Sequence, residues 1–184
     1  MKKKDEVEII PSEEIIIGNP AAPVTLTEFV DYESEQTAKV HHIVKELMSE
    51  FGDKINFNIR HFPQTMVHQR AHKAAEAAIG AAQEGKLWEM HELLIENRRH
   101  LGTVTLKLYA REAGVKAKSF LDDLINGKYG WFVQDDLRFG LEMGIAEAPA
   151  FLINGERFDK KITLKNLSEA IKAALRKKKL RKAA

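Results

Sequence analysis

The sequence predicts an α/β fold in which a βαβ unit and a ββα unit flank a helical insertion. Two strand-like stretches, VTLTEFVD and INFNIRHF, lie on either side of a long amphipathic helical pattern. A third strand-like stretch, APAFLI, precedes a closing amphipathic helix, and the region between the two units is helical throughout. Hydrophobic residues make up 44% of the 184 residues, which is enough to bury a core.

The βαβ unit begins after a loop that contains Pro20 and Pro23. Residues 24–31 are rich in β-branched and aromatic side chains, which predicts a strand. Apolar residues then recur every three or four positions as far as about Phe51, so we expect a helix with one buried face. A second strand follows over residues 55–62. A unit of this length predicts two parallel neighbouring strands joined by a right-handed crossover.

The predicted insertion covers residues 64–145 and contains five helical segments. Four of them are AHKAAEAAIGAAQEG, LWEMHELLIEN, TLKLYAREAGV and AKSFLDDLING, and the fifth covers residues 131–143. Most of these segments end at, or are separated by, a glycine, which commonly stops a helix.

The ββα unit closes the fold. Its Asn154-Gly155 pair predicts a two-residue hairpin turn between two antiparallel strands. The final helix begins near TLKNLSEAI, and Thr163 is the expected N-cap. We therefore divide the chain into an N-terminal extension (1–17), one domain (18–175) and a basic tail (176–184).

The net charge of +2 conceals an uneven distribution. Nine cations lie at the two ends, in the KKK of residues 2–4 and in the tail, and acids outnumber bases between them. We interpret the tail as a solvated helix end, so neither nucleic acid nor a membrane is an expected partner. No apolar run reaches the length of a membrane span and no export signal is visible. A cytoplasmic location is expected, or a periplasmic one if a signal peptide has been removed.

Several stretches carry a family resemblance: NPAAPVTLTEFVDY, RHFP, GKLWEMHELL and APAFLINGERF. They resemble the DsbA-like branch of the thioredoxin-fold oxidoreductases over about residues 18–175. The resemblance implies a thioredoxin fold with a helical insertion. In that family the turn between the first strand and the first helix carries Cys-x-x-Cys. Here Ser34 and Thr37 occupy the two cysteine positions, with Glu35 and Gln36 between them.

The chain contains no cysteine, and this excludes disulfides, thiolate nucleophiles and cysteine-bound metals. Disulfide exchange requires a thiolate that attacks a sulfur, so the sequence predicts a redox-inactive protein. We interpret Ser34 as a helix N-cap. Glu35 interacts favourably with the positive end of the helix, but it disfavours a second anion at position 34.

Two further positions belong to the predicted site. Glu28 lies six residues before Ser34, where the resembled family has a buried acid that accepts a proton. Since no thiol is present, we interpret Glu28 as one partner of a buried ion pair with Arg60 on the next strand. Ala148 and Pro149 precede the hairpin, where the family has a cis-proline loop that contacts an extended peptide or thiol substrate.

Three functions remain open from the sequence. The favoured one is a redox-inactive module that binds peptides or proteins, or acts as a chaperone, through the groove between Ser34 and Pro149. The second is a glutathione-dependent enzyme, because the related kappa-class glutathione transferases use a serine at this turn. The third is a structural or regulatory interaction domain. No cofactor is expected, and no metal either, although His68 and His72 have ligand-like spacing. His91 is expected to be a packed helix residue.

Overall fold

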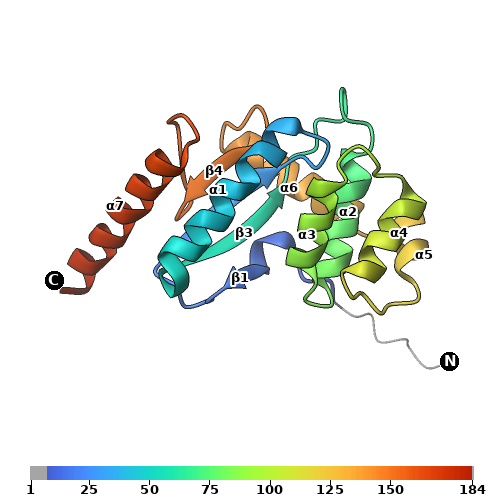
Figure 1. The fold of residues 1–184 in the computed structure, drawn as a ribbon, viewed down its shortest axis with the longest axis horizontal. Coiled ribbons are helices and arrows are strands. Elements are labelled where there is room, and N and C mark those ends of the chain that lie inside the picture. Colours follow the sequence, from blue (N-terminus) through green and yellow to red (C-terminus); the bar gives the residue numbers. More distant parts are fainter. Residues whose placement is uncertain (1–7, 184) are drawn as a thin grey trace.

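The structure is a computed structural model that describes residues 8–183, and it contains one five-stranded mixed sheet. The strands are β1 (Ile16–Gly18), β2 (Val24–Val30), β3 (Ile55–His61), β4 (Ala150–Ile153) and β5 (Glu156–Arg157). They are ordered β1-β3-β2-β4-β5, and only β2 and β3 are parallel. This arrangement confirms the predicted fold class, a βαβ unit and a ββα unit on one sheet (Figure 1).

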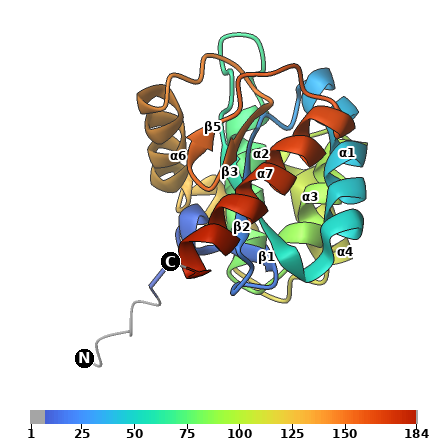
Figure 2. The ribbon, with the colours of Figure 1, turned by 90° about the vertical axis from the view of Figure 1, so that its left-hand side faces the viewer.

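Helices cover both faces of the sheet. Helices α1 (Glu35–Phe51) and α7 (Leu164–Ala183) lie on one face, and α6 (Gly130–Glu142) lies on the other (Figure 2). Side chains of β2 alternate between these two faces. Leu26 therefore packs in the large core with Val44 and Leu47, whereas Phe29 packs with Phe62 beneath α6.

The first four helices of the insertion pack beside the sheet, at the end of the molecule opposite α7 (Figure 1). These helices are α2 (Ala71–Ala82), α3 (Leu87–Glu96), α4 (Thr103–Glu112) and α5 (Phe120–Ile125), and α6 is the fifth. All five predicted helical segments are confirmed. Alanines make α2 narrow, so neighbouring helices approach it closely, and ten of its residues are buried.

The structure differs from the sequence prediction near the N-terminus. Strand β1 lies in the stretch that we assigned to an extension, and it pairs with β3 in antiparallel register. The Asn58 side chain donates hydrogen bonds to the carbonyls of Ser12 (2.7 Å) and Ile15 (3.0 Å), which holds the preceding 3-10 turn, Ser12–Glu14, against the sheet. The predicted basic start, residues 2–4, lies outside the described residues.

Two predicted local features of the ββα unit are confirmed. Asn154 and Gly155 both have positive φ, 51° and 80°, which a two-residue hairpin turn requires. Thr163 Oγ1 accepts a hydrogen bond from the Asn166 backbone N–H at 3.2 Å, so it caps α7. Helix α7 continues into the basic tail as far as Ala183. None of the helices within residues 8–183 combines the length and the apolar character needed to cross a membrane.

Candidate functional site

The predicted site lies in the turn between β2 and α1, and Ser34 begins the helix there. Its Oγ accepts hydrogen bonds from the backbone N–H groups of Gln36 (3.2 Å) and Thr37 (3.3 Å). The Ser34 residue is only 5% exposed. The N-cap interpretation is therefore confirmed, and both bonds satisfy helix donors that would otherwise lack a partner.

Two further positions of the turn, Glu35 and Thr37, face different surroundings. Thr37 is buried, and its Oγ1 accepts from the Asp31 backbone N–H at 3.4 Å. Glu35 is exposed and pairs with Lys39 one helical turn away, at 2.8 Å. The hydrogen bond and the charge of Lys39 lower the pKa of Glu35, so an anion stays at the N-terminus of α1.

Asp31 connects this turn to the loop after β3. Its Oδ1 accepts from the Glu33 backbone N–H at 2.9 Å. Its Oδ2 accepts from the Gln64 backbone N–H at 2.8 Å and lies 2.8 Å from Nδ1 of His68. The Glu33 side chain accepts from the Arg70 backbone N–H at 2.6 Å. The two acids therefore hold both ends of residues 64–70, which we call the β3 loop, against the turn.

The tip of the β3 loop is apolar and exposed. Met66 is 95% exposed and Val67 is 72% exposed. Two adjacent apolar side chains are therefore exposed to water on a loop that is fixed at both ends beside the Ser34 turn.

Pro149 reaches the same end of the sheet as Ser34, because the strand register places it there. Ala150 opens β4 and pairs with Phe29, one residue before the end of β2. The two strands are antiparallel, so residue 149 precedes β4 at the end where the chain leaves β2 for Ser34. The Ala148-Pro149 peptide bond is cis, and Ala148 is buried.

The predicted ion pair between Glu28 and Arg60 is wrong. Glu28 pairs with Ile59 in the parallel register, whereas Arg60 pairs with Phe29, so the two side chains point to opposite faces of the sheet. Both carboxylate oxygens of Glu28 lack a hydrogen-bond partner, and the residue is 1% exposed. Burial raises the pKa of Glu28 to about 8, so this carboxyl is protonated at neutral pH.

The partner of Arg60 is Asp136 on α6. Arg60 Nε lies 2.5 Å from Asp136 Oδ1, and the two groups form an ion pair whose angle does not suit a hydrogen bond. The Arg60 guanidinium also lies 3.1 Å from a carboxylate oxygen of Glu13. The other oxygen, Oδ2, accepts from the His61 backbone N–H at 3.0 Å and lies 2.7 Å from His61 Nδ1. Asp136 therefore fixes α6 to the end of β3, directly before the β3 loop.

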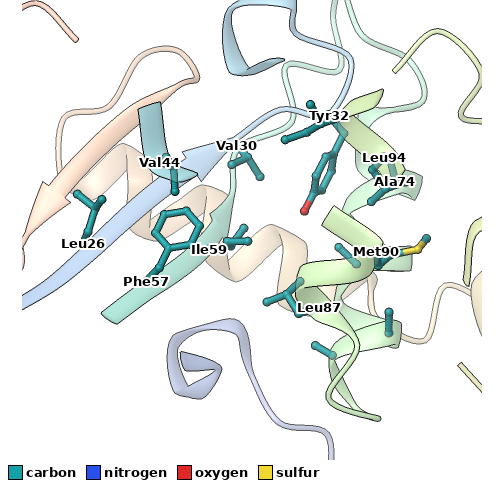
Figure 3. Close-up of a cluster of buried hydrophobic side chains, with 14 of the residues drawn as sticks. Leu26, Val30, Tyr32, Val44, Phe57, Ile59, Ala74, Leu87, Met90 and Leu94 are labelled. Carbon is teal, nitrogen blue, oxygen red and sulfur yellow. The ribbon is translucent and has the colours of Figure 1, made fainter. Parts of the chain in front are cut away.

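A second buried polar contact lies under the turn. Tyr32 follows β2, and its ring extends into the space between the sheet and the insertion, towards α3 (Figure 3). Its hydroxyl lies 3.1 Å from His91 Nδ1. Burial lowers the pKa of His91 well below its usual value, so the imidazole is neutral. The prediction of a packed His91 is confirmed, since its exposed fraction is 0%.

Neither histidine of the predicted ligand-like pair faces the other. His68 contacts Asp31, and His72 lies 3.3 Å from Glu76 on the same helix. Within the described part of the chain, no cluster of three or more His, Asp or Glu residues has a metal-binding arrangement.

Sequence reasoning missed Asp31 and Asp136 as organisers of the site. The signal for Asp136 was its spacing, because it lies three residues after Val133 and four before Gly140, both on the buried face of α6. A carboxylate on a buried helix face requires a donor. For Asp31 the signal was its position directly after a buried strand, where the polar residues of α/β sites commonly lie.

The fold and the turn define a class of protein, namely a thioredoxin fold with a helical insertion and no cysteine at the strand-helix turn. The sequence matches the thioredoxin family over residues 11–173. The chain therefore belongs to this family.

Several solved structures share this fold, among them a thioredoxin-like oxidoreductase and a thiol-disulfide exchange protein. Oxidised BdbD from Bacillus subtilis has a TM-score of 0.80 at 22% identity, covering 90% of this chain and 96% of that chain. A thioredoxin-like oxidoreductase from Silicibacter pomeroyi has a TM-score of 0.76 at 22% identity, covering 92% of each chain. Similarity at this level of identity establishes the fold alone.

The curated relatives are longer proteins. The chain is 30% identical over 175 residues to a protein named Na(+)/H(+) antiporter NhaA 3 from Salinispora tropica, a match that covers 95% of this chain and 27% of that protein. A protein named Na(+)/H(+) antiporter NhaA 1 from Mycolicibacterium gilvum is 32% identical over 81% of this chain and 24% of its own length. The chain thus spans about a quarter of the length of these relatives.

Proposed function

We propose that this protein is a redox-inactive peptide-binding module, which holds extended or unfolded segments of other proteins at the end of the sheet where Ser34 and Pro149 lie. The observation that carries the proposal is the fixed β3 loop beside the Ser34 turn. Asp31 and Glu33 hold its two ends, so the exposed pair Met66 and Val67 stays in place beside the turn.

Each part of this end of the sheet has a role in the proposed binding. The loop before β4 offers backbone groups to an extended peptide, which adds to the protein as a short strand. Met66 and Val67 contact apolar side chains of that peptide, and a methionine adapts its shape to different partners. Ser34 and Thr37 keep the turn folded through their bonds to the helix start and to Asp31. None of these interactions requires a thiol.

The test measures how well the chain suppresses aggregation of reduced α-lactalbumin, followed by light scattering. Met66→Ser with Val67→Ser should remove most of the suppression. The matched control is Ile125→Ser with Leu141→Ser, two apolar residues that are 64% and 59% exposed on α5 and α6. The control should suppress aggregation as the parent does. Equal loss in both variants, or no suppression by the parent, would refute the proposal.

Ser34→Ala separates this proposal from the glutathione-dependent alternative. Peptide binding should survive the change because the Ser34 hydroxyl acts on the helix start. A glutathione-dependent turnover that Ser34→Ala abolishes would support the transferase function instead.

A second candidate function follows from the length of the curated relatives. Since 95% of this chain matches 27% of a protein named an antiporter, the chain can serve as a regulatory domain for a sodium–proton antiporter. The measurement is ion exchange by the Salinispora tropica protein in vesicles, with its matching segment present, deleted or replaced by this chain. A changed pH or sodium response on deletion, restored by replacement, would support regulation. Identical responses would exclude it.

A further inference from the structure

Helix α4 has an outer face that combines apolar and basic side chains. Val104 is 71% exposed and Leu108 is 57% exposed. Lys107 and Arg111 lie on the same face, since positions 104, 107, 108 and 111 follow helical spacing. The opposite face of α4 packs into the protein through Leu106 and Ala110, so the core does not use this outer face.

A cavity of about 510 Å³ adjoins this face, between α4 and the start of α5. Its lining includes the cations Lys107, Arg111, Lys116 and Lys118 and the buried apolar residues Ala110 and Phe120. Within residues 8–183, no ion pair includes any of the four cations. Four positive charges therefore surround an apolar floor without a carboxylate partner.

The rim of this cavity is held in place. Glu84 Oε2 accepts from the Lys116 backbone N–H, and Oε1 accepts from the Ala117 backbone N–H, both at 2.9 Å. Backbone donors thus occupy both oxygens of Glu84, and the loop between α4 and α5 is fixed where it carries Lys116 and Lys118. A preformed rim loses little conformational entropy when a partner binds.

We propose that this face of the insertion docks an acidic amphipathic helix of a partner protein. Glutamates or aspartates of that helix pair with the four cations. Its leucines cover Val104 and Leu108, and one apolar side chain enters the cavity as an anchor. The concave shape favours a protein segment, because a flat lipid surface leaves the cavity unfilled. Helix α4 belongs to the insertion, whereas the Ser34 turn lies at the end of the sheet, so the two surfaces are separate (Figure 1).

The experiment uses the whole chain and a fluorescein-labelled synthetic helix with leucine and glutamate at helical spacing, titrated by fluorescence anisotropy. Lys107→Glu with Arg111→Glu should weaken binding by about tenfold or more, because attraction becomes repulsion at two positions. The matched control, Lys160→Glu with Lys161→Glu, makes the same charge change at two exposed lysines elsewhere. It should bind within about twofold of the parent. Leu108→Ser tests the apolar part, and circular dichroism checks that each variant is folded.

Two further probes decide the nature of the partner. A peptide in which lysine replaces each glutamate should not bind. Added salt should weaken the binding of the acidic peptide, because salt screens the attraction between the charges. Equal weakening by the control pair, or no saturable binding of the acidic peptide at low salt, would overturn the proposal. Binding to phosphatidylserine vesicles that depends on Lys107 and Arg111, without binding of the peptide, would replace the protein partner by a membrane surface. These outcomes are independent of Met66 and Val67, so they do not test the peptide site.

Discussion

Asp31 Oδ2 lies 2.8 Å from His68 Nδ1, and this contact joins two segments that are 37 residues apart in the sequence. The Asp31 side chain is fully buried, whereas the His68 side chain is 28% exposed. A buried carboxylate therefore holds a loop that lies at the surface of the protein. Because Asp31 also holds the turn before Ser34, displacement of the loop and displacement of the turn are coupled.

The first prediction concerns this coupling. Asp31→Asn removes the charge and one of the two acceptor oxygens, so the bonds to Gln64 and His68 weaken. We expect a loss of about 1–3 kcal/mol in the free energy of unfolding, the usual effect of leaving buried donors unsatisfied. Hydrogen exchange at the Gln64 and Glu33 amides should accelerate. Asp135→Asn is the control, since that acid pairs with the exposed Arg138. Unchanged exchange at Gln64 would contradict the role of Asp31.

The second prediction concerns Glu28 and pH. Burial raises its pKa from the ordinary 4.5 to about 8, so the folded state holds a proton that the unfolded state releases above pH 4.5. Stability attributable to Glu28 should therefore fall as pH rises from 4.5 to about 8 and level off above that. The full effect is on the order of 5 kcal/mol for a shift of this size.

Glu28→Gln tests this titration, because glutamine is neutral at every pH and close in shape to the protonated acid. Urea unfolding of both proteins between pH 5 and pH 9 gives the comparison. The variant should gain relative stability as pH rises. Two parallel stability profiles would show that Glu28 does not titrate in this range.

The third prediction is that the scaffold still supports the missing chemistry. The chain alone should neither reduce insulin disulfides nor oxidise a dithiol peptide, since it has no cysteine. Ser34→Cys with Thr37→Cys places two thiols three residues apart at the start of α1, within the Cα separation of about 7 Å that a disulfide allows. A disulfide should form, detectable by thiol labelling before and after reduction.

Glu35 provides the electrostatic part of that experiment. In the Ser34→Cys, Thr37→Cys background, Glu35→Gln should lower the pKa of the thiol at position 34, because a nearby negative charge is removed. The measurement is thiolate absorbance against pH. Lys39→Gln should instead raise the pKa of that thiol, since Lys39 pairs with Glu35 and partly neutralises its charge. No change in the thiolate titration on replacing Glu35 would contradict the electrostatic account.

The fourth prediction isolates the cap. Ser34→Ala leaves the Gln36 and Thr37 N–H groups without their acceptor and should lower the free energy of unfolding by about 1 kcal/mol. Ser34→Asp is the matched control, because aspartate caps helices as well as serine does. Urea unfolding distinguishes the two variants. Equal losses of unfolding free energy in Ser34→Ala and Ser34→Asp would mean that the Ser34 hydroxyl does not stabilise the protein as a helix cap.

The sequence predicted most of the fold because its signals are local. The spacing of apolar residues predicts the helices, and the Asn154-Gly155 pair predicts the hairpin turn. Thr163 and Ser34 stand directly before helical segments, where a hydroxyl caps a helix. Strand β1 was missed because three residues carry too little pattern. Its pairing with β3 depends instead on distant contacts, such as those of Asn58 with Ser12 and Ile15.

The candidate site was harder to predict because its contacts cross between elements. Glu28 and Arg60 are both buried on neighbouring strands, and opposite charges suggested a pair. Register decides the outcome, since a shift of one position in a strand reverses the direction of a side chain. The true partner of Arg60, Asp136, lies 76 residues further along the chain on a helix. No local pattern links these two residues before the fold is known.

The two outer strands of the sheet have a consequence for self-association. At one edge lies β1 with three residues, and at the other lies β5 with two. Such short edges offer few free backbone groups to a strand from another copy, so the sheet resists growing from molecule to molecule. Copies of this chain at high concentration should therefore not assemble into fibres through their sheets.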